Sequence, residues 1–265
     1  MSKPSNGRVI WEGESLLDGS PIMVIAIGFK ASSKNRKTGD MIQTYILRRD
    51  ISPTDAVQSG ADFSICGSCP HRGTVEPVSP RSKRTRNKGR TCYVNLGQGA
   101  LGVYRTYVRG KYPEWDGTGV AGRIVRLGTY GDPAAVPVHV WTDLLDGAAG
   151  FTGYTHQWRD PRFALLKQFC MASADSQLDA LTAQAKGWRT FRVSLNQERD
   201  PRSKNEALCP ASAEAGKKLT CNQCLACDGT ASCRRGSIYI PAHGGTAVMA
   251  NVRRRAALQV VTMEV

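Results

Sequence analysis

Cysteine is the residue type whose spacing in this sequence points most directly to chemistry. The chain has 9 cysteines in 265 residues, and an odd number without a secretory signal argues against a disulfide framework. In Cys221-Asn-Gln-Cys224-Leu-Ala-Cys227 two residues separate successive thiols, a spacing that turns each pair toward one metal centre. Cys209 and Cys233 are the distal candidates. Zn²⁺ or a [4Fe–4S] cluster would suit this set, and the even spacing with a nearby Cys-Pro favours iron–sulfur; reduced core thiols are the alternative.

A second cysteine group precedes the middle of the chain. Cys66-Gly-Ser-Cys69-Pro-His71 is followed by Cys92-Tyr93. This group predicts either a separate metal site or a cluster with one open iron position, and the sequence leaves open whether the two groups share one site. Cys170 lies in an apolar run, where a buried structural thiol is the ordinary interpretation.

Two aspartates stand where parallel α/β folds collect reacting groups, just after strand-like segments. Asp132 follows Tyr130-Gly131, and Asp175 follows Ala172-Ser173. Carboxylates in such positions could serve as a nucleophile or as a general acid and base. Either residue could instead cap the helix that follows it.

Further polar and aromatic residues near strand ends could bind a substrate. His156 could contact a base or a phosphate, and aromatic rings could stack on a base lifted from a duplex. Structural roles in the core are the alternative for all of them. The candidates are Tyr130, Tyr154, His156 and Trp158.

A strong positive charge indicates a polyanionic partner. The formal net charge is +14, and basic side chains gain affinity for phosphates by releasing condensed counterions. One segment between Cys69 and Cys92 is predicted to bind nucleic acid; the alternative is a solvated loop without a binding role. Its basic residues are Arg81, Lys83, Arg84, Arg86, Lys88 and Arg90.

The elements that must position these residues alternate between strand and helix after residue 120. This alternation requires right-handed crossovers and a parallel sheet, so we expect an α/β fold that forms a complete or partial TIM-like (β/α) barrel; an open doubly wound sheet is the alternative. Residues 1–60 are predicted to hold a β-hairpin, and residues 61–265 the barrel with a Cys-rich segment at 209–233. The expected strands are 22–28, 42–47, 123–128, 151–155, 168–172, 188–195 and 237–241, with strand ends at 63–66 and 92–95; the expected helices are 100–109, 134–145, 162–166 and 176–186.

No run of eighteen apolar residues occurs, and the first residues lack an apolar signal segment. We therefore expect an intracellular protein without a membrane span.

The motifs of the middle of the chain resemble the phage "gene product 88" group over roughly residues 60 to 230. The resemblance rests on the first cysteine group with Cys92-Tyr93, on an Arg-rich strand ending in Gly-Asp, and on a Tyr-Thr-x-x-Trp strand. Here the two strands read Arg126-Leu-Gly-Thr-Tyr-Gly-Asp132 and Tyr154-Thr-His-Gln-Trp158. Ala172-Ser-Ala-Asp175-Ser, Gly187-Trp-Arg189 and the second cysteine group complete the set.

That group is similar to phage enzymes that place 7-deazaguanines in DNA, and through them to tRNA-guanine transglycosylases. The resemblance implies a TIM barrel with a metal site, an Asp nucleophile, DNA and a free 7-deazaguanine base as substrates, and action in the cytoplasm of the infected host cell. The CxxCxxC spacing differs from the CxCxxC…His zinc pattern of the tRNA enzymes.

Two other functions remain open from the sequence. A cluster on Cys66, Cys69 and Cys92 would suit a radical S-adenosylmethionine-like enzyme, although the CxxxCxxC spacing of that family is missing. A metal-stapled DNA-binding protein without enzymatic activity would also explain the charge and the cysteines.

Overall fold

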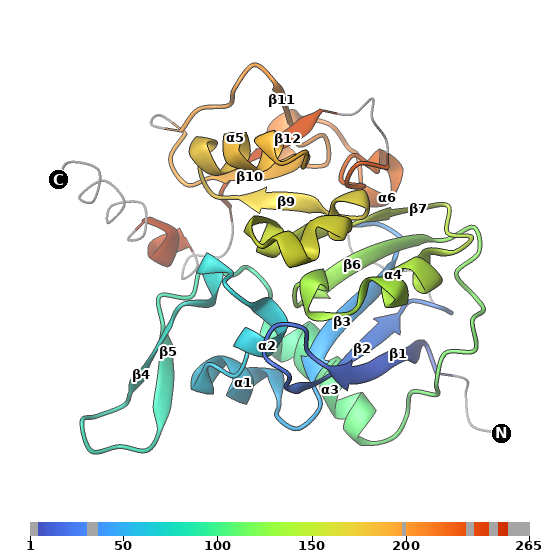
Figure 1. Cartoon of the computed structure of the whole chain (residues 1–265), viewed down its shortest axis with the longest axis vertical. Coiled ribbons are helices and arrows are strands. Elements are labelled where there is room, and N and C mark those ends of the chain that lie inside the picture. Colours follow the sequence, from blue (N-terminus) through green and yellow to red (C-terminus); the bar gives the residue numbers. More distant parts are fainter. Residues whose placement is uncertain (1–4, 31–36, 198–199, 232–235, 244–248, 254–265) are drawn as a thin grey trace.

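The computed structural model describes residues 5–30, 37–197, 200–231, 236–243 and 249–253. Figure 1 shows sheet strands through the middle of the molecule, helices packed around them, and one hairpin that projects from the body. Strands and helices are mixed along the whole chain, and most strand pairs outside the N-terminal region are parallel. The expected α/β class with parallel strands is confirmed.

The first sheet has the strand order β1-β2-β3-β6-β7. Its N-terminal strands β1 to β3 are antiparallel, whereas β3, β6 and β7 are parallel. The residues of β2 and β3 are buried almost continuously, as in strands covered on both faces. The expected hairpin between residues 22 and 47 is therefore confirmed, and β3 joins it directly to the parallel strands. The strands are β1 (Gly7–Glu14), β2 (Pro21–Ile27), β3 (Ile42–Arg48), β6 (Ile124–Tyr130) and β7 (Gly150–Thr152).

The second sheet has the order β11-β12-β10-β9-β8 and is parallel throughout. Only Gly153 separates β7 from β8, so the two sheets meet within one stretch of chain. Within the described residues β1 and β11 are edge strands and no pairing joins them, which means that the described strands do not form a closed barrel. The strands are β8 (Tyr154–Thr155), β9 (Met171–Ala174), β10 (Thr190–Ser194), β11 (Glu206–Leu208) and β12 (Ser237–Pro241).

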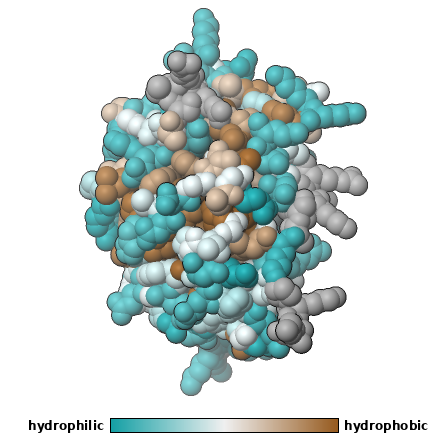
Figure 2. All heavy atoms as spheres, turned by 90° about the vertical axis from the view of Figure 1, so that its right-hand side faces the viewer, coloured by the Kyte–Doolittle hydropathy of each residue, from teal (hydrophilic) through white to brown (hydrophobic). Residues whose placement is uncertain are grey.

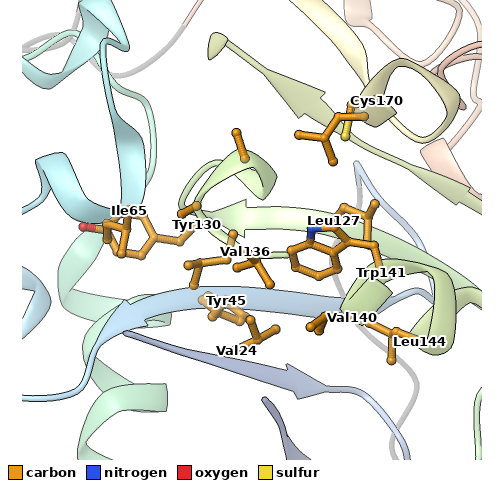
Figure 3. Close-up of a cluster of buried hydrophobic side chains, with 14 of the residues drawn as sticks. Val24, Tyr45, Ile65, Leu127, Tyr130, Val136, Val140, Trp141, Leu144 and Cys170 are labelled. Carbon is orange, nitrogen blue, oxygen red and sulfur yellow. The ribbon is translucent and has the colours of Figure 1, made fainter. Parts of the chain in front are cut away.

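The helices cover the sheets with their apolar faces. Trp141 and Leu144 of α4 are fully buried, and Figure 3 shows Trp141 beside Leu127 of β6, with Cys170 close by. In α5 the buried residues are alanines, which allow the helix to approach β9 and β10 closely. The helices are α1 (Pro53–Ser59), α2 (Phe63–Cys66), α3 (Leu101–Val108), α4 (Val138–Leu145), α5 (Gln177–Ala185) and α6 (Cys221–Cys224), with a π-helical turn at Leu96–Ala100 and 3₁₀ turns at Pro70–Arg72, Pro133–Ala135, Gln157–Arg159, Pro161–Gln168 and Ala213–Ala215.

The projecting hairpin is the two-stranded sheet of β4 (Thr74–Pro77) and β5 (Thr85–Lys88). Figure 1 shows that it extends away from the sheets beside α1. Asn87 fixes it there, because its side-chain amide donates to the carbonyl oxygens of Val57 and Arg72. The segment expected to be a basic loop is thus largely the tip and second strand of a hairpin.

Several sequence expectations about elements are wrong. Phe63–Cys66 is a helical turn and not a strand end, and residues 92–95 form no regular strand. The expected strand at 168–172 begins later, at Met171, because the preceding residues continue a 3₁₀ turn to Gln168. The other expected strands and the helices at 100–109, 134–145 and 176–186 are found, the second of them split into a 3₁₀ turn and α4.

The surface of the molecule mixes hydrophilic and hydrophobic side chains. Figure 2 shows the right-hand side of Figure 1, where hydrophobic residues lie across the middle and hydrophilic residues predominate above and below. Among the described residues no helix has the length and apolar character needed to cross a membrane.

Replacement of Leu144 by alanine is expected to lower the free energy of unfolding by about 2–5 kcal/mol, because the residue is fully buried and leaves a cavity. Leu181→Ala is the matched control: this leucine is 56% exposed, and a change within about 0.5 kcal/mol is expected. Urea unfolding followed by tryptophan fluorescence measures both variants. Equal effects of the two substitutions would contradict the assignment of α4 to the core.

Candidate functional site

Three polar residues follow the carboxyl ends of three neighbouring parallel strands. Asp132 comes two residues after β6, His156 directly after β8, and Asp175 directly after β9. Because β6 pairs with β7, and β8 with β9, these ends lie along one edge of the joined sheets. This is the edge where α/β folds place reacting groups, as the sequence predicted for both aspartates.

Asp175 forms the centre of the site. His71 Nε2 donates to Asp175 Oδ1 at 2.8 Å, and His156 Nε2 lies 3.8 Å from Asp175 Oδ2. The Asp175 side chain is 9% exposed. Ser176, and not Asp175, caps α5, because its hydroxyl accepts from Asp179 N. The alternative interpretation of Asp175 as a helix cap is therefore wrong.

His71 is the residue that the sequence analysis did not place in this site. It belongs to the 3₁₀ turn Pro70–Arg72, which β4 follows. Its Nδ1 lies 2.7 Å from Thr91 Oγ1, so both ring nitrogens are engaged and the ring is fixed between Thr91 and Asp175. Its only sequence signal was its position next to Cys69-Pro70, which suggested a spare metal ligand.

The Asp132 side chain accepts hydrogen bonds from two backbone N–H groups beside the site. Its Oδ1 accepts from Ala134 N at 3.0 Å and its Oδ2 from His156 N at 2.8 Å. Burial raises the pKa of this carboxyl group, and the hydrogen bonds from Ala134, Thr155, His156 and Gln157 oppose that shift. Asp132 therefore caps the 3₁₀ turn at Pro133–Ala135, as the capping alternative anticipated, and it also fixes His156.

The aromatic candidates have different surroundings. Trp158 is 2% exposed, donates from Nε1 to Ser173 O, and has the Arg159 guanidinium over its ring. Tyr130 is also buried, and burial raises its pKa. Neither ring presents a face to an incoming base, which fits the alternative interpretation of core aromatics. Tyr154 is half-buried and its ring lies against Phe191.

The first cysteine group lies beside the aspartates. Cys66 ends α2, and Cys69 precedes the turn that carries His71. Burial raises the pKa of both thiols, and the charges of Cys92 and Asp132 raise both further. Cys69 N donates to Cys66 O, Cys92 N donates to His71 O, and Asp132 N donates to Ile65 O, so the three cysteines lie on segments that meet beside the site. Cys170 is fully buried, as expected for a structural thiol.

The second cysteine group lies apart from the Asp175 site, around α6. Cys209 follows β11, and Cys221 and Cys224 lie in α6. Cys233 is outside the described residues. Among the residues that the structure describes, the one set of three potential metal-ligand atoms within 4.8 Å of one another is that of His71, His156 and Asp175. No three described thiols approach that closely.

Comparison with known proteins adds no relative: no family model, no curated protein and no solved structure matches this chain. The resemblance to the phage group therefore stays a prediction.

Asp132→Asn is expected to lower the free energy of unfolding by about 1–3 kcal/mol, because an amide nitrogen would face a backbone N–H and leave it unsatisfied. The folded-state pKa of Asp132 is raised, so its contribution to stability is present below the unfolded-state pKa and is lost as the pH rises through the folded-state pKa. The deficit of the variant should accordingly shrink with rising pH. Thermal unfolding over a pH series measures this, with the exposed Asp143→Asn as control; equal stabilities at every pH would contradict the structural role.

Proposed function

We propose that this protein is a DNA-modifying enzyme that exchanges guanine in DNA for a 7-deazaguanine derivative, built on a partial (β/α) barrel. The observation that supports this proposal best is the convergence of two features at one edge of the sheets. These are the Asp175 carboxylate with its two histidines, and a basic hairpin that begins and ends at that same site.

Asp175 is the carboxylate best placed to act as the nucleophile. In the proposed first step its oxygen attacks C1′ of the deoxyribose, the C1′–N9 bond breaks, and its electron pair stays on the guanine. The departing base takes up a proton at N9. In the second step N9 of the incoming base loses its proton and attacks C1′, which releases the Asp175 carboxylate.

The two histidines suit the accompanying proton transfers. His71 orients one oxygen of Asp175 through its hydrogen bond. His156 faces the other oxygen, at 3.8 Å, and its backbone is fixed by Asp132. We assign proton transfer with the leaving and entering bases to His156. Asp132, with both carboxylate oxygens occupied by backbone donors, is a positioning residue in this scheme.

The basic hairpin is the proposed contact with the DNA backbone. Arg81, Lys83, Arg84 and Arg86 are exposed, and no ion pair of theirs is recorded among the described residues. Lys88 pairs with Glu76, and Arg90 donates to the backbone of Cys92 and Val94. The first four residues are therefore the ones available to phosphates, whereas Arg90 fixes the foot of the hairpin.

The hairpin is joined directly to the site. His71 lies three residues before the first residue of β4, and the chain returns after β5 to Thr91. The backbone nitrogens of Thr91 and Cys92 both donate to His71 O. DNA held along the hairpin would thus be held next to Asp175.

Asp175→Asn is expected to abolish base exchange while leaving DNA affinity within about twofold, because an amide is a poor nucleophile of nearly the same size. Release of labelled guanine from DNA in the presence of a free 7-deazaguanine measures the activity, and a labelled oligonucleotide retained by denatured protein measures the covalent intermediate. Asp146→Asn on the exposed end of α4 is the control. Undiminished exchange by Asp175→Asn would overturn the assignment of the nucleophile.

Joint substitution of Arg81, Lys83, Arg84 and Arg86 by glutamine is expected to weaken DNA binding and flatten its salt dependence. Each lost phosphate contact lowers the slope of log K against log salt by about 0.9. The control is the same number of substitutions at exposed basic residues away from the hairpin, namely Arg105, Lys111, Lys217 and Lys218. Fluorescence anisotropy at several salt concentrations measures both variants. A slope that changes equally in both would show that the hairpin has no special role.

A radical S-adenosylmethionine-like function is the second candidate, and one observation favours it. The segments that carry Cys66, Cys69 and Cys92 are hydrogen-bonded to one another and, through Ile65, to Asp132 at the strand ends. Reductive cleavage of S-adenosylmethionine by anaerobically reconstituted protein, with dithionite as the reductant, would support this second function. If the protein exchanges bases and does not cleave S-adenosylmethionine, the second function is excluded.

A further inference from the structure

Two histidines and one carboxylate converge from three separate elements of the fold. His71 lies in the 3₁₀ turn Pro70–Arg72, His156 follows β8, and Asp175 follows β9. One ligand atom of each residue lies within 4.8 Å of the other two. His71 Nε2 lies 2.8 Å from Asp175 Oδ1, and His156 Nε2 lies 3.8 Å from Asp175 Oδ2. The fold brings these groups together, since 104 residues separate His71 from Asp175.

These distances fit the coordination of a first-row transition-metal ion. Zn²⁺ binds imidazole nitrogens at about 2.0–2.1 Å and carboxylate oxygens at about 2.0–2.2 Å, so two ligand atoms of one tetrahedral ion lie about 3.4 Å apart. The two measured separations from Asp175, 2.8 and 3.8 Å, lie on either side of that value. Small side-chain rotations would therefore bring the three ligand atoms to coordinating distance.

The second ring nitrogen of His71 is held by a buried hydroxyl group. Its Nδ1 lies 2.7 Å from Oγ1 of Thr91, a residue that is 5% exposed. A metal-binding imidazole usually donates its other ring N–H to an oxygen, which fixes the tautomer and the orientation of the ring. Because a hydroxyl group can accept or donate, Thr91 supports either tautomer of His71. Nε2 can therefore hold a proton for Asp175 or present its lone pair to a metal.

The other two ligands are also held in position by hydrogen bonds. His156 N donates to Asp132 Oδ2 at 2.8 Å, and Asp175 N donates to Asp179 Oδ2 at 3.2 Å. The rings of His71 and His156 meet edge to face, with their centres 5.4 Å apart. An outer layer of hydrogen bonds of this kind is usual around metal ligands in proteins. Ligands that are held in advance lose less freedom when they bind an ion.

The three side chains are enclosed but still reached by solvent. The side chains of His71 and His156 are 16% and 18% exposed, and that of Asp175 is 9% exposed. Partial burial strengthens the attraction between a carboxylate and a cation, and the remaining exposure leaves a path for an ion to enter. Two imidazoles and one carboxylate suit Zn²⁺ or Fe²⁺, whereas Mg²⁺ and Ca²⁺ prefer sites made of oxygen atoms.

We propose that His71, His156 and Asp175 bind one divalent first-row transition-metal ion, which inhibits base exchange reversibly. The binding of the ion is independent of the proposed base-exchange function, whereas the inhibition rests on it. A carboxylate that shares an electron pair with a cation is a weak nucleophile. His156, when it is bound to the same ion, cannot transfer a proton to or from a base. The metal-bound state and the base-exchanging state of the site therefore exclude one another.

The first test counts bound Co²⁺ by equilibrium dialysis in the presence of excess Mg²⁺. At the same free concentration, the unsubstituted protein is expected to bind one Co²⁺ more than Asp175→Asn and one more than His156→Gln. His139→Ala, at an exposed position on α4, is the matched control and should bind as much as the unsubstituted protein.

The difference between proteins is the measured quantity, because the chain also has 9 cysteines that can bind Co²⁺. The difference spectrum between the unsubstituted protein and Asp175→Asn should lack the intense absorption of cobalt–thiolate bonds. Circular dichroism spectra that match the unsubstituted protein show that the variants are folded. Equal Co²⁺ counts in the unsubstituted protein and both site variants would overturn the metal site.

The second test measures base exchange while Co²⁺ is added. At a free concentration ten times the dissociation constant found by dialysis, the rate is expected to fall about tenfold, because only the empty sites react. Removal of the ion by a chelator should restore the rate. The residual activity of His71→Gln, which lacks one ligand but keeps Asp175 and His156, should resist the same concentration.

The two tests separate the metal site from the base-exchange function. An undiminished rate when the site is filled would overturn the inhibition. Metal-free protein without exchange activity would contradict the base-exchange function and the inhibition that rests on it. The dialysis experiment decides the metal site in either case.

Discussion

The arrangement of both cysteine-rich regions and of the Asp175 site depends on the backbone at Gly153. This residue separates β7 from β8, and its N–H donates to Cys227 O while its carbonyl accepts from Met171 N. A Cβ at this position would lie 2.7 Å from Cys170 Sγ and 2.9 Å from Phe169 O, which is closer than packed atoms allow. Only glycine lets the chain pass from one sheet to the next here. The passage brings β6, β8 and β9 into adjacent positions, so that Asp132, His156 and Asp175 share an edge.

Buried charge is the second constraint, and the charges of different residues are compensated in different ways. Arg192 is fully buried but pairs with Glu206 and Asp200, so it forms a closed structural network. Asp132 is buried, and hydrogen bonds from backbone N–H groups compensate its carboxylate. Arg126 is only half-buried; its guanidinium donates to the Tyr93 hydroxyl and lies over the Tyr154 ring.

The sequence predicted the second half of the fold well because apolar strands and helices alternate there with regular lengths. Elements without that contrast were missed. Strands β4 and β5 are short and mostly exposed, so no apolar periodicity marks them, and α2 is a single turn. Helix α1 had a recognisable start in Ser52-Pro53 and a stop in Gly60, signals that could have identified it. Asp132 and Asp175 were found because their position after strands is a local property. His71 was not, because its partner Asp175 lies 104 residues away.

The joining of the hairpin to His71 has a consequence for how binding and chemistry relate. A basic hairpin far from the site would only raise the local concentration of DNA. Here the first foot of the hairpin is the turn that carries His71, and the second foot, at Thr91, bonds to the same imidazole ring. Any displacement of the hairpin, such as the proposed binding of DNA would cause, must therefore move residues that orient Asp175. Because Asn87 ties the hairpin to α1, such a displacement is restrained to a small movement. Under the proposed function, this construction links the geometry of Asp175 to the position of the nucleic acid, so that base exchange occurs only when a substrate is held in place.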